Sequence, residues 1–270
     1  CPECYLVQLD EFEHPENIFS NYAYFSSFSD TWNDHIESFV NSVISRFDIS
    51  QEKQIIEVAS NDGYLLKHFK KKNFSILGIE PAKNIAKEAE SNGIPTINKF
   101  FGINTAEELS SNGKKADLLI AFNVLPHVPN LNEFVKGLKI LLDPKGLLVV
   151  QFSAYLSKLI SQREFDTIYH EHYSYFSLFT LNKIFSAHDL KIFDVDELSI
   201  HGGSLRIYAT HKKQKVIVSK KIQKLIDKEK KLGLRNLATY KNFNERVVSL
   251  KFDLWKFFIN AQKQGKKVVC

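Results

Sequence analysis

The sequence is poor in cysteine and lacks any long hydrophobic run. Only three cysteines occur among 270 residues, and two of them, Cys1 and Cys4, are separated by two residues. This number does not suit the disulfide framework of a small secreted domain. No stretch of 18 apolar residues occurs, which argues against a transmembrane helix, and no secretory signal precedes Cys1. We therefore expect a cytoplasmic protein that does not span a membrane.

The excess of positive over negative charge is also small. The chain has 36 Lys and Arg against 31 Asp and Glu, which leaves a net charge of +5. Much of the excess lies between Lys212 and Lys231, where apolar residues alternate with lysines. This pattern is typical of an amphipathic helix with a solvated charged face, and a landing site for an anionic substrate is the second interpretation. The charge does not indicate nucleic-acid binding, and we expect a monomer that acts on a small molecule.

The middle of the chain alternates apolar runs with helical patterns. The candidate strands are Ile55–Val58, Phe74–Ile79, Asp117–Ala121 and Gly146–Val150. The candidate helices lie near residues 63–72, 82–92, 105–110 and 131–142. Such alternation predicts an α/β fold with a parallel sheet and crossover helices. Residues 190–195 and 204–209 then predict a closing antiparallel pair of strands.

A polar turn connects the first of these strands directly to a helix. It consists of Ser60, Asn61, Asp62 and Gly63. The carboxyl end of the first strand of an open α/β sheet is where adenine cofactors bind, and a glycine there lets the backbone approach a ligand. Glu80 follows the second strand, where a carboxylate can accept hydrogen bonds from both ribose hydroxyls. Taken alone, Glu80 is equally explained as an acid that favours the dipole of the next helix.

The number of glycines in this turn distinguishes two classes of cofactor. A dinucleotide fingerprint needs three spaced glycines to admit a pyrophosphate, and the turn has only Gly63. S-adenosylmethionine has no phosphate, and its amino acid tail suits polar side chains such as Asn61 and Asp62. A further segment, 123–128, contains Asn123 and His127 and follows the third predicted strand, where the methionine end of the cofactor would lie. The sequence therefore favours a methyltransferase over a nicotinamide-dependent oxidoreductase.

Five titratable side chains gather within seven residues later in the chain. They are Asp166, Tyr169, His170, Glu171 and His172. Methylation of a carbon beside a ketone needs a base for the α-proton and a group that stabilises the enolate. Imidazole suits the first role because its ordinary pKa lies near working pH. A metal site and a polar loop without chemistry are the alternatives, although adjacent side chains rarely converge on one ion.

A pair of glycines marks a further segment, which runs from His201 through Gly202, Gly203 and Ser204 to Arg206. A hairpin turn before a strand is the simplest interpretation. The functional alternative is a loop at the rim of the substrate pocket. In that case Arg206 is available to a phosphate or carboxylate.

The motifs together resemble those of class I S-adenosylmethionine-dependent methyltransferases. More narrowly, the chain resembles the nucleotide-sugar C-methyltransferases that act on 4-keto deoxyhexoses. The resemblance extends over almost the whole chain and rests on the segments 22–27, 57–63, 80–81, 123–128, 142–146, 164–172 and 201–206. It implies a Rossmann-like, seven-stranded, mostly parallel sheet, S-adenosylmethionine as cofactor and a nucleotide-linked sugar as substrate. Gln151 and Pro126 depart from the family pattern, which usually has Glu and Ala there.

The resemblance also implies roles for individual residues. His172 would be the base, with Tyr169 and Glu171 holding or polarising the sugar. The cofactor pocket would be formed by Glu57, Ser60, Asn61, Asp62, Gly63, Glu80, Pro81, Asn123, His127 and Tyr24. The substrate would contact His201, Gly202, Gly203, Ser204 and Arg206. An O-methyltransferase for another small molecule and a catalytically inactive module that binds cofactor or sugar remain the alternatives.

Three segments follow from the resemblance. Residues 1–50 would contain part of a zinc-binding domain and a leading helix, and residues 51–212 the methyltransferase domain. Residues 213–270 would form a long helix and the first strand of a C-terminal Rossmann-like domain, with Cys270 buried in that strand. Cys1 and Cys4 supply half of a tetrahedral structural zinc site, and we expect zinc only if the other pair of cysteines lies upstream of this sequence. From the two ends we expect the sequence to be a piece of a longer protein.

Overall fold

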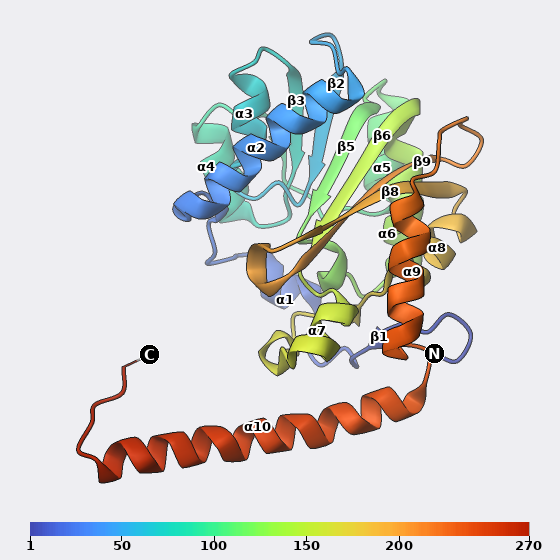
Figure 1. Cartoon of the computed structure of the whole chain (residues 1–270). Coiled ribbons are helices and arrows are strands. Elements are labelled where there is room, and N and C mark those ends of the chain that lie inside the picture. The colour runs from blue at the N-terminus through green and yellow to red at the C-terminus, as the bar shows by residue number, and fades with distance from the viewer. Residues whose placement is uncertain (270) are drawn as a thin grey trace.

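A seven-stranded sheet forms the centre of the computed structural model, which describes residues 1–269 (Figure 1). Its strand order is β4-β3-β2-β5-β6-β9-β8. The strands are β2 (Gln54–Val58), β3 (Ser75–Ile79), β4 (Thr96–Ile97), β5 (Ala116–Phe122), β6 (Leu142–Phe152), β8 (Leu190–Leu198) and β9 (Ser204–His211). The first five run parallel, whereas β9 is antiparallel to both of its neighbours. The predicted fold class is confirmed.

Helices cover both faces of this sheet. They are α2 (Asp30–Phe47), α3 (Leu66–Lys70), α4 (Lys83–Ser91), α5 (Ile103–Ser111), α6 (Leu131–Leu141) and α8 (Leu178–Ala187). Successive strand residues point to opposite faces, so Ile55 packs with α2 and α3 while Ile56 packs with α5, α6 and α8. Two apolar layers therefore hold the sheet rigidly, and its strand ends are fixed in position.

Short elements tie the N-terminal segment to the later half of the chain. Strand β1 (Val7–Gln8) pairs antiparallel with β7 (Ser174–Tyr175), directly after the segment rich in titratable residues. Helix α1 (Pro15–Phe19) follows β1, and α7 (Leu156–Gln162) follows β6. The sequence pattern does not predict α1, α7 or β4. These elements are two to seven residues long, too short for a clear apolar period.

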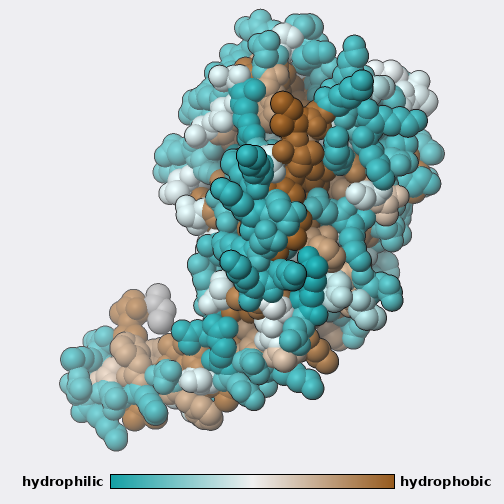
Figure 2. Space-filling view, turned by 45° about the vertical axis from the view of Figure 1, so that its right-hand side comes forward, coloured by the Kyte–Doolittle hydropathy of each residue, from teal (hydrophilic) through white to brown (hydrophobic). Residues whose placement is uncertain are grey.

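Two helices end the described part of the chain. Helix α9 (Lys220–Leu232) packs its apolar side on the core, and α10 (Leu237–Lys263) projects from the body of the molecule (Figure 1). The buried strand predicted at 266–269 is wrong, because no strand lies beside this segment and Val269 is 91% exposed. Cys270 lies outside the described residues. Apolar side chains are visible on the α10 arm at the lower left of Figure 2.

The predicted zinc half-site finds no further ligands. Cys1 is exposed, Cys4 is half-buried, and both are free thiols. Within residues 1–269 no group of three or more His, Cys, Asp or Glu side chains could hold a metal ion. Two thiolates do not complete a structural zinc site, so the structure does not support zinc. Among the same residues, no helix combines the length and apolar character needed to cross a membrane.

Candidate active site

A cavity of about 890 Å³ lies at the carboxyl ends of β2, β3, β5 and β6. This is the edge at which open α/β sheets bind their ligands. Nine residues predicted for the site line it: Tyr24, Asn61, Glu80, Pro81, Asn123, His127, Tyr169, His172 and His201. The residues predicted for cofactor binding and those predicted for catalysis therefore line the same cavity. We call the part around Tyr169 and His172 the chemical end.

Glu80 is held in a fixed orientation at one side of the cavity. Its Oε2 accepts a hydrogen bond from the backbone N–H of Asn61 at 2.9 Å, and its Oε1 accepts one from Ala82 at 2.9 Å. Burial raises the pKa of Glu80 to about 7, although both N–H donors act in the opposite direction. Each oxygen keeps a lone pair for another donor. The carboxylate is therefore suited to accept hydrogen bonds from a ligand with two neighbouring hydroxyls.

Several polar atoms around the 60–63 turn are buried without a hydrogen-bond partner in residues 1–269. They are both carboxylate oxygens of Glu57, Ser60 Oγ, Asp62 Oδ1 and Asn123 Oδ1. Burial raises the pKa of Glu57 well above its ordinary value. Such groups are costly to bury unpaired, and they are common where a ligand or water supplies the missing partner.

Of the predicted cofactor residues, four lie behind the cavity wall. Glu57, Ser60, Asp62 and Gly63 do not line the cavity. Gly63 has a φ of +79°, and an added Cβ would lie 2.7 Å from Cγ1 of Ile94. Packing against Ile94 and the left-handed backbone explain this glycine, rather than the ligand approach that the sequence suggested.

The segment Tyr22–Ser27 covers the cavity and is bound by the same turn. The side chain of Asn61 accepts a hydrogen bond from the Ser26 N–H at 2.9 Å and donates one to the Tyr24 carbonyl at 3.1 Å. Asp62 Oδ2 accepts a third from the Ser27 N–H at 3.2 Å. We call Tyr22–Ser27 the strap. Asn61 and Asp62 thus anchor the strap as well as shape the turn, a role that the sequence did not reveal.

His172 lies at the chemical end with a defined tautomer. Its Nδ1 lies 2.9 Å from the carbonyl oxygen of Thr167, and its Nε2 lies 3.3 Å from the Tyr169 hydroxyl. A carbonyl can only accept, so Nδ1 carries the hydrogen and Nε2 presents a lone pair. Burial lowers the pKa of His172, partly offset by the Thr167 carbonyl. Burial and the charge of Glu171 raise the pKa of Tyr169, which keeps its phenol protonated.

A second imidazole, that of His127, packs against His172. The two rings lie 4.8 Å apart at an edge-to-face angle of 61°. Nδ1 of His127 lies 2.9 Å from the Glu171 carbonyl, and burial together with His172 lowers the pKa of His127 to about 3. The Glu171 carboxylate accepts a hydrogen bond from Tyr22 of the strap at 3.3 Å and does not line the cavity. His127 therefore belongs to the chemical end as well as to the predicted cofactor pocket.

The glycine-paired loop brings one of its predicted residues to the cavity. His201 lines it, whereas Gly202, Gly203 and Ser204 do not. Ser204 is buried, and its Oγ donates to the Ile200 carbonyl at 3.0 Å. These three residues thus shape the loop that presents His201.

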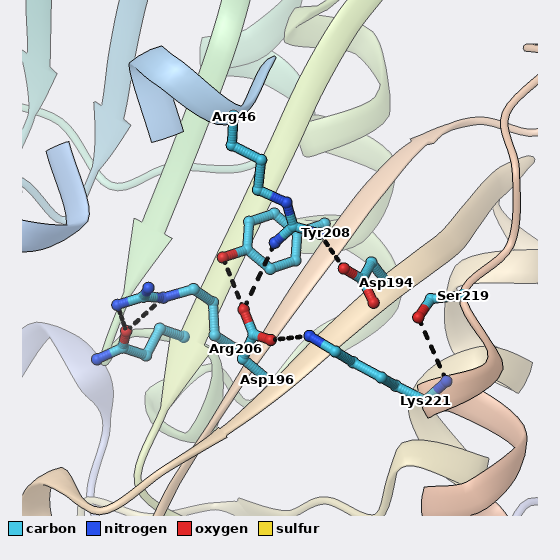
Figure 3. A network of polar contacts seen from close by, with 8 residues as sticks. Arg46, Asp194, Asp196, Arg206, Tyr208, Ser219 and Lys221 are labelled. Carbon is cyan, nitrogen blue, oxygen red and sulfur yellow. Dashed lines mark hydrogen bonds and ion pairs between the residues drawn. The ribbon is translucent and has the colours of Figure 1, made fainter. Parts of the chain in front are cut away.

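Arg206 is not available to a ligand phosphate, and this prediction is corrected. Strands β6 and β9 align Arg206 with Gln151, and its Nε donates to Gln151 Oε1 at 2.8 Å. The side chain is buried under α2, where its Cζ lies 4.4 Å from the Phe39 ring centroid. Figure 3 shows Arg206 beside an ion-pair network in which Arg46 of α2 pairs with Asp194 and Asp196 of β8.

Two family profiles match the sequence of this chain. The profile of a methyltransferase-domain family matches residues 32–195, which is more than half of the chain. The chain belongs to this methyltransferase-domain family. A second profile, of a C-methyltransferase C-terminal domain, matches residues 199–270 of the same methyltransferase chain. The boundaries at 51 and 212 stay a prediction.

Relatives of this methyltransferase chain include the C-methyltransferase NovU of Streptomyces niveus, which is 29% identical over 99% of the chain and 64% of NovU. The chain thus spans less than two thirds of that relative. Among solved structures, the PH0226 protein of Pyrococcus horikoshii superposes with a TM-score of 0.54 at 15% identity. The match covers 74% of this chain and 99% of that one. Magnesium protoporphyrin IX methyltransferase of Synechocystis, with bound SAH, superposes with a TM-score of 0.51 at 14% identity. The match covers 66% of this chain and 82% of that one. These likenesses support the fold.

Proposed function

We propose that the chain transfers a methyl group from S-adenosylmethionine to a carbon adjacent to a ketone of a nucleotide-linked deoxyhexose. One observation carries the proposal: an imidazole whose Nε2 presents a lone pair beside the Tyr169 hydroxyl lies in the same cavity as a carboxylate suited to a ribose. A base and a cofactor pocket in one cavity meet the needs of carbon methylation beside a ketone.

The residues at the β2 and β3 ends fit S-adenosylmethionine. Glu80 has lone pairs for the ribose hydroxyls, and the unpaired oxygen of Asn123 suits the ammonium of the methionine tail. A bound cationic ligand would also offset the negative charge of Asp62 and Glu80 around the turn. When bound, the cofactor supplies an electrophilic methyl group. The chain's own residues then bind and orient it under the strap.

The chemical end suits removal of an α-proton. His172 Nε2 takes the proton from the acceptor carbon, because Nδ1 is already committed to the Thr167 carbonyl. The Tyr169 hydroxyl, now 3.3 Å from Nε2, then turns to the ketone oxygen and donates to the developing enolate. Glu171 acts through Tyr22, whose hydroxyl it holds, and so positions the strap.

Similarity supports the finer assignment. NovU is named as a C-methyltransferase, and the C-terminal match is to a C-methyltransferase domain. The nucleotide-sugar substrate comes from the motif resemblance. We also propose a monomer in the cytoplasm, the location expected from the few cysteines and the lack of a long apolar run. A hydroxyl acceptor would also use a base, so the choice of carbon as the acceptor atom rests on the C-methyltransferase matches.

The decisive experiment uses two acceptors that differ in one group. The purified chain is incubated with S-adenosylmethionine and either a nucleoside-diphosphate 4-keto-6-deoxyhexose or its 4-hydroxy reduction product. We expect a gain of one methyl with the ketone only, and a new carbon–carbon-bonded methyl by NMR. Methylation of the reduced sugar would indicate O-methyl transfer. Cofactor binding by calorimetry without turnover of either sugar would indicate an inactive binding module and contradict the proposal.

A further inference from the structure

Trp32 of α2 lies at the centre of an aromatic stack at the cavity wall. Its ring stacks on His201 with centroids 4.7 Å apart and on His35 with centroids 5.3 Å apart. Trp32 is only 3% exposed, whereas His201 is exposed, and both line the cavity. His201 therefore has one ring face packed on Trp32 and further ring surface open toward the cavity.

The loop that carries His201 adopts a costly conformation. His201 has φ +52° and ψ +46°, a left-handed backbone that non-glycine residues seldom adopt. Gly202 and Gly203 follow with φ of +74° and +139°, and the Gly203 N–H closes the turn on the Ile200 carbonyl at 3.1 Å. Such strain is retained where the surrounding structure enforces it, and it is concentrated at functional sites. Here its effect is to hold the imidazole over Trp32.

The other end of the stack is fixed by the buried Arg206. Its NH2 group lies 3.0 Å from His35 Nε2, and a guanidinium can only donate. His35 therefore accepts at Nε2, and burial together with Arg206 lowers its pKa, so the ring stays neutral. Gln151 orients Arg206 in turn through Nε at 2.8 Å. Three neighbouring elements, β6, β9 and α2, thus fix the stack beneath His201.

We propose that the stack on Trp32 holds His201 so that its open ring face packs against the sugar ring of the acceptor. Arg206, His35 and Trp32 are positioning residues that act through it. The proposal rests on the function proposed above and deepens it. A sugar ring presents an apolar C–H face that suits an aromatic surface, while its ketone side faces Tyr169. The stack also explains why Arg206 is buried rather than exposed at the pocket rim.

The two tryptophans make the stack directly observable. Trp32 and Trp255 are the only ones in the chain, and Trp255 is 54% exposed on α10. A Trp255→Phe background leaves Trp32 as the single fluorophore next to His201. We expect a saturable change in its emission when the nucleoside-diphosphate 4-keto-6-deoxyhexose is added. In His201→Ala this change should be lost, and His201→Phe should restore it because the ring is retained.

Kinetics provide the second readout. His201→Ala is expected to raise the KM for the ketosugar on the order of 3- to 10-fold, the size of an aromatic packing contact, while the Kd for S-adenosylmethionine stays within about twofold. His188→Ala, at a half-buried histidine that ends α8 and does not line the cavity, is the matched control. An unchanged KM, or an equal loss of cofactor binding, would overturn the proposal. Turnover without a Trp32 response contradicts only the stack, whereas a Trp32 response without turnover contradicts only the proposed reaction.

Discussion

The Nδ1 atom of His172 lies 2.9 Å from the carbonyl oxygen of Thr167. Thr167 belongs to a short 3₁₀ helix, and the pairing of β7 with β1 fixes the segment that follows His172. The backbone thereby sets the tautomer of a side chain five residues away. This one contact decides which ring nitrogen can accept a proton from a ligand in the cavity.

Replacement of His172 by Asn should abolish most turnover. Asn fills similar space but has no basic nitrogen, and a positioned general base contributes about 10²- to 10⁴-fold to rate. We expect a loss of that order in kcat, with cofactor affinity within about twofold by calorimetry. His170→Asn is the control, since His170 is an exposed neighbour that does not line the cavity. An equal loss in both variants would remove His172 from the mechanism.

The pH dependence of turnover should show the lowered pKa of His172. Only the neutral ring can accept a proton, so kcat at saturating cofactor rises with pH through the pKa of this residue. Burial lowers that pKa, which places the midpoint of the acid limb below the ordinary value of about 6.5. Initial rates between pH 5 and 8 test this expectation. A midpoint above the ordinary value would point to a different base.

Glu80 should make cofactor affinity depend on pH. Its pKa of about 7 means that half of the carboxyl groups are protonated near neutrality in the ligand-free protein. Hydroxyl donors favour the ionised form, so the Kd for S-adenosylmethionine should increase as pH falls from 8 to 6, approaching about tenfold per unit below the pKa. Glu80→Gln should weaken binding by roughly 10- to 100-fold and abolish this dependence. Glu90→Gln, an exposed acid of α4, should change neither quantity.

Removal of the Asn61 side chain should loosen the strap. Asn61→Ala deletes the hydrogen bonds to Ser26 and Tyr24 that hold it down, each worth about 1 kcal/mol. We expect cofactor dissociation to become roughly tenfold faster in stopped-flow measurements, with a smaller effect on association. Asn112→Ala, at the exposed end of α5, serves as the control. If the dissociation rate does not change, the strap does not retain the ligand.

Glu229 should be required for stability although it is far from the cavity. This buried residue of α9 accepts hydrogen bonds from the first two N–H groups of α8, those of Leu178 and Phe179, and from the Tyr155 hydroxyl. Glu229→Ala leaves these donors unpaired, and we expect the free energy of unfolding in urea to fall by about 3 kcal/mol. Glu229→Gln retains one oxygen and should lose less. Glu245→Ala, an exposed acid of α10, should stay within about 0.5 kcal/mol.

The sequence was sufficient to predict the long strands and the turn between them. Runs such as Ile55–Val58 are continuous apolar segments because both faces of a central strand are covered. Strand β4 was missed because it consists only of Thr96 and Ile97, and such a pair has no period. The apolar run at 266–269 has the pattern of a strand but finds no neighbour to pair with.

The directions of the Arg206 and Asn61 side chains could not be predicted from the sequence. Arg206 follows a glycine loop and seemed available to a substrate, yet the register of β6 and β9 places it opposite Gln151. Nothing in the order of residues specifies that register. The same holds for Asn61, whose hydrogen bonds connect it to a segment 35 residues earlier. By contrast, Tyr169 and His172 are three residues apart, so their proximity followed from the sequence.

The cavity is lined by residues that lie outside the segment matched by the methyltransferase-domain family. The match to the methyltransferase-domain family begins at residue 32, after the strap, and ends at residue 195, before His201. Yet the strap residue Tyr24 and His201 both face the cavity. Residues 32–195 alone, transferred into another protein, would therefore lack two parts of the cavity lining: the strap and the loop that carries His201. The cavity thus depends on residues from both sides of the segment that the family profile matches.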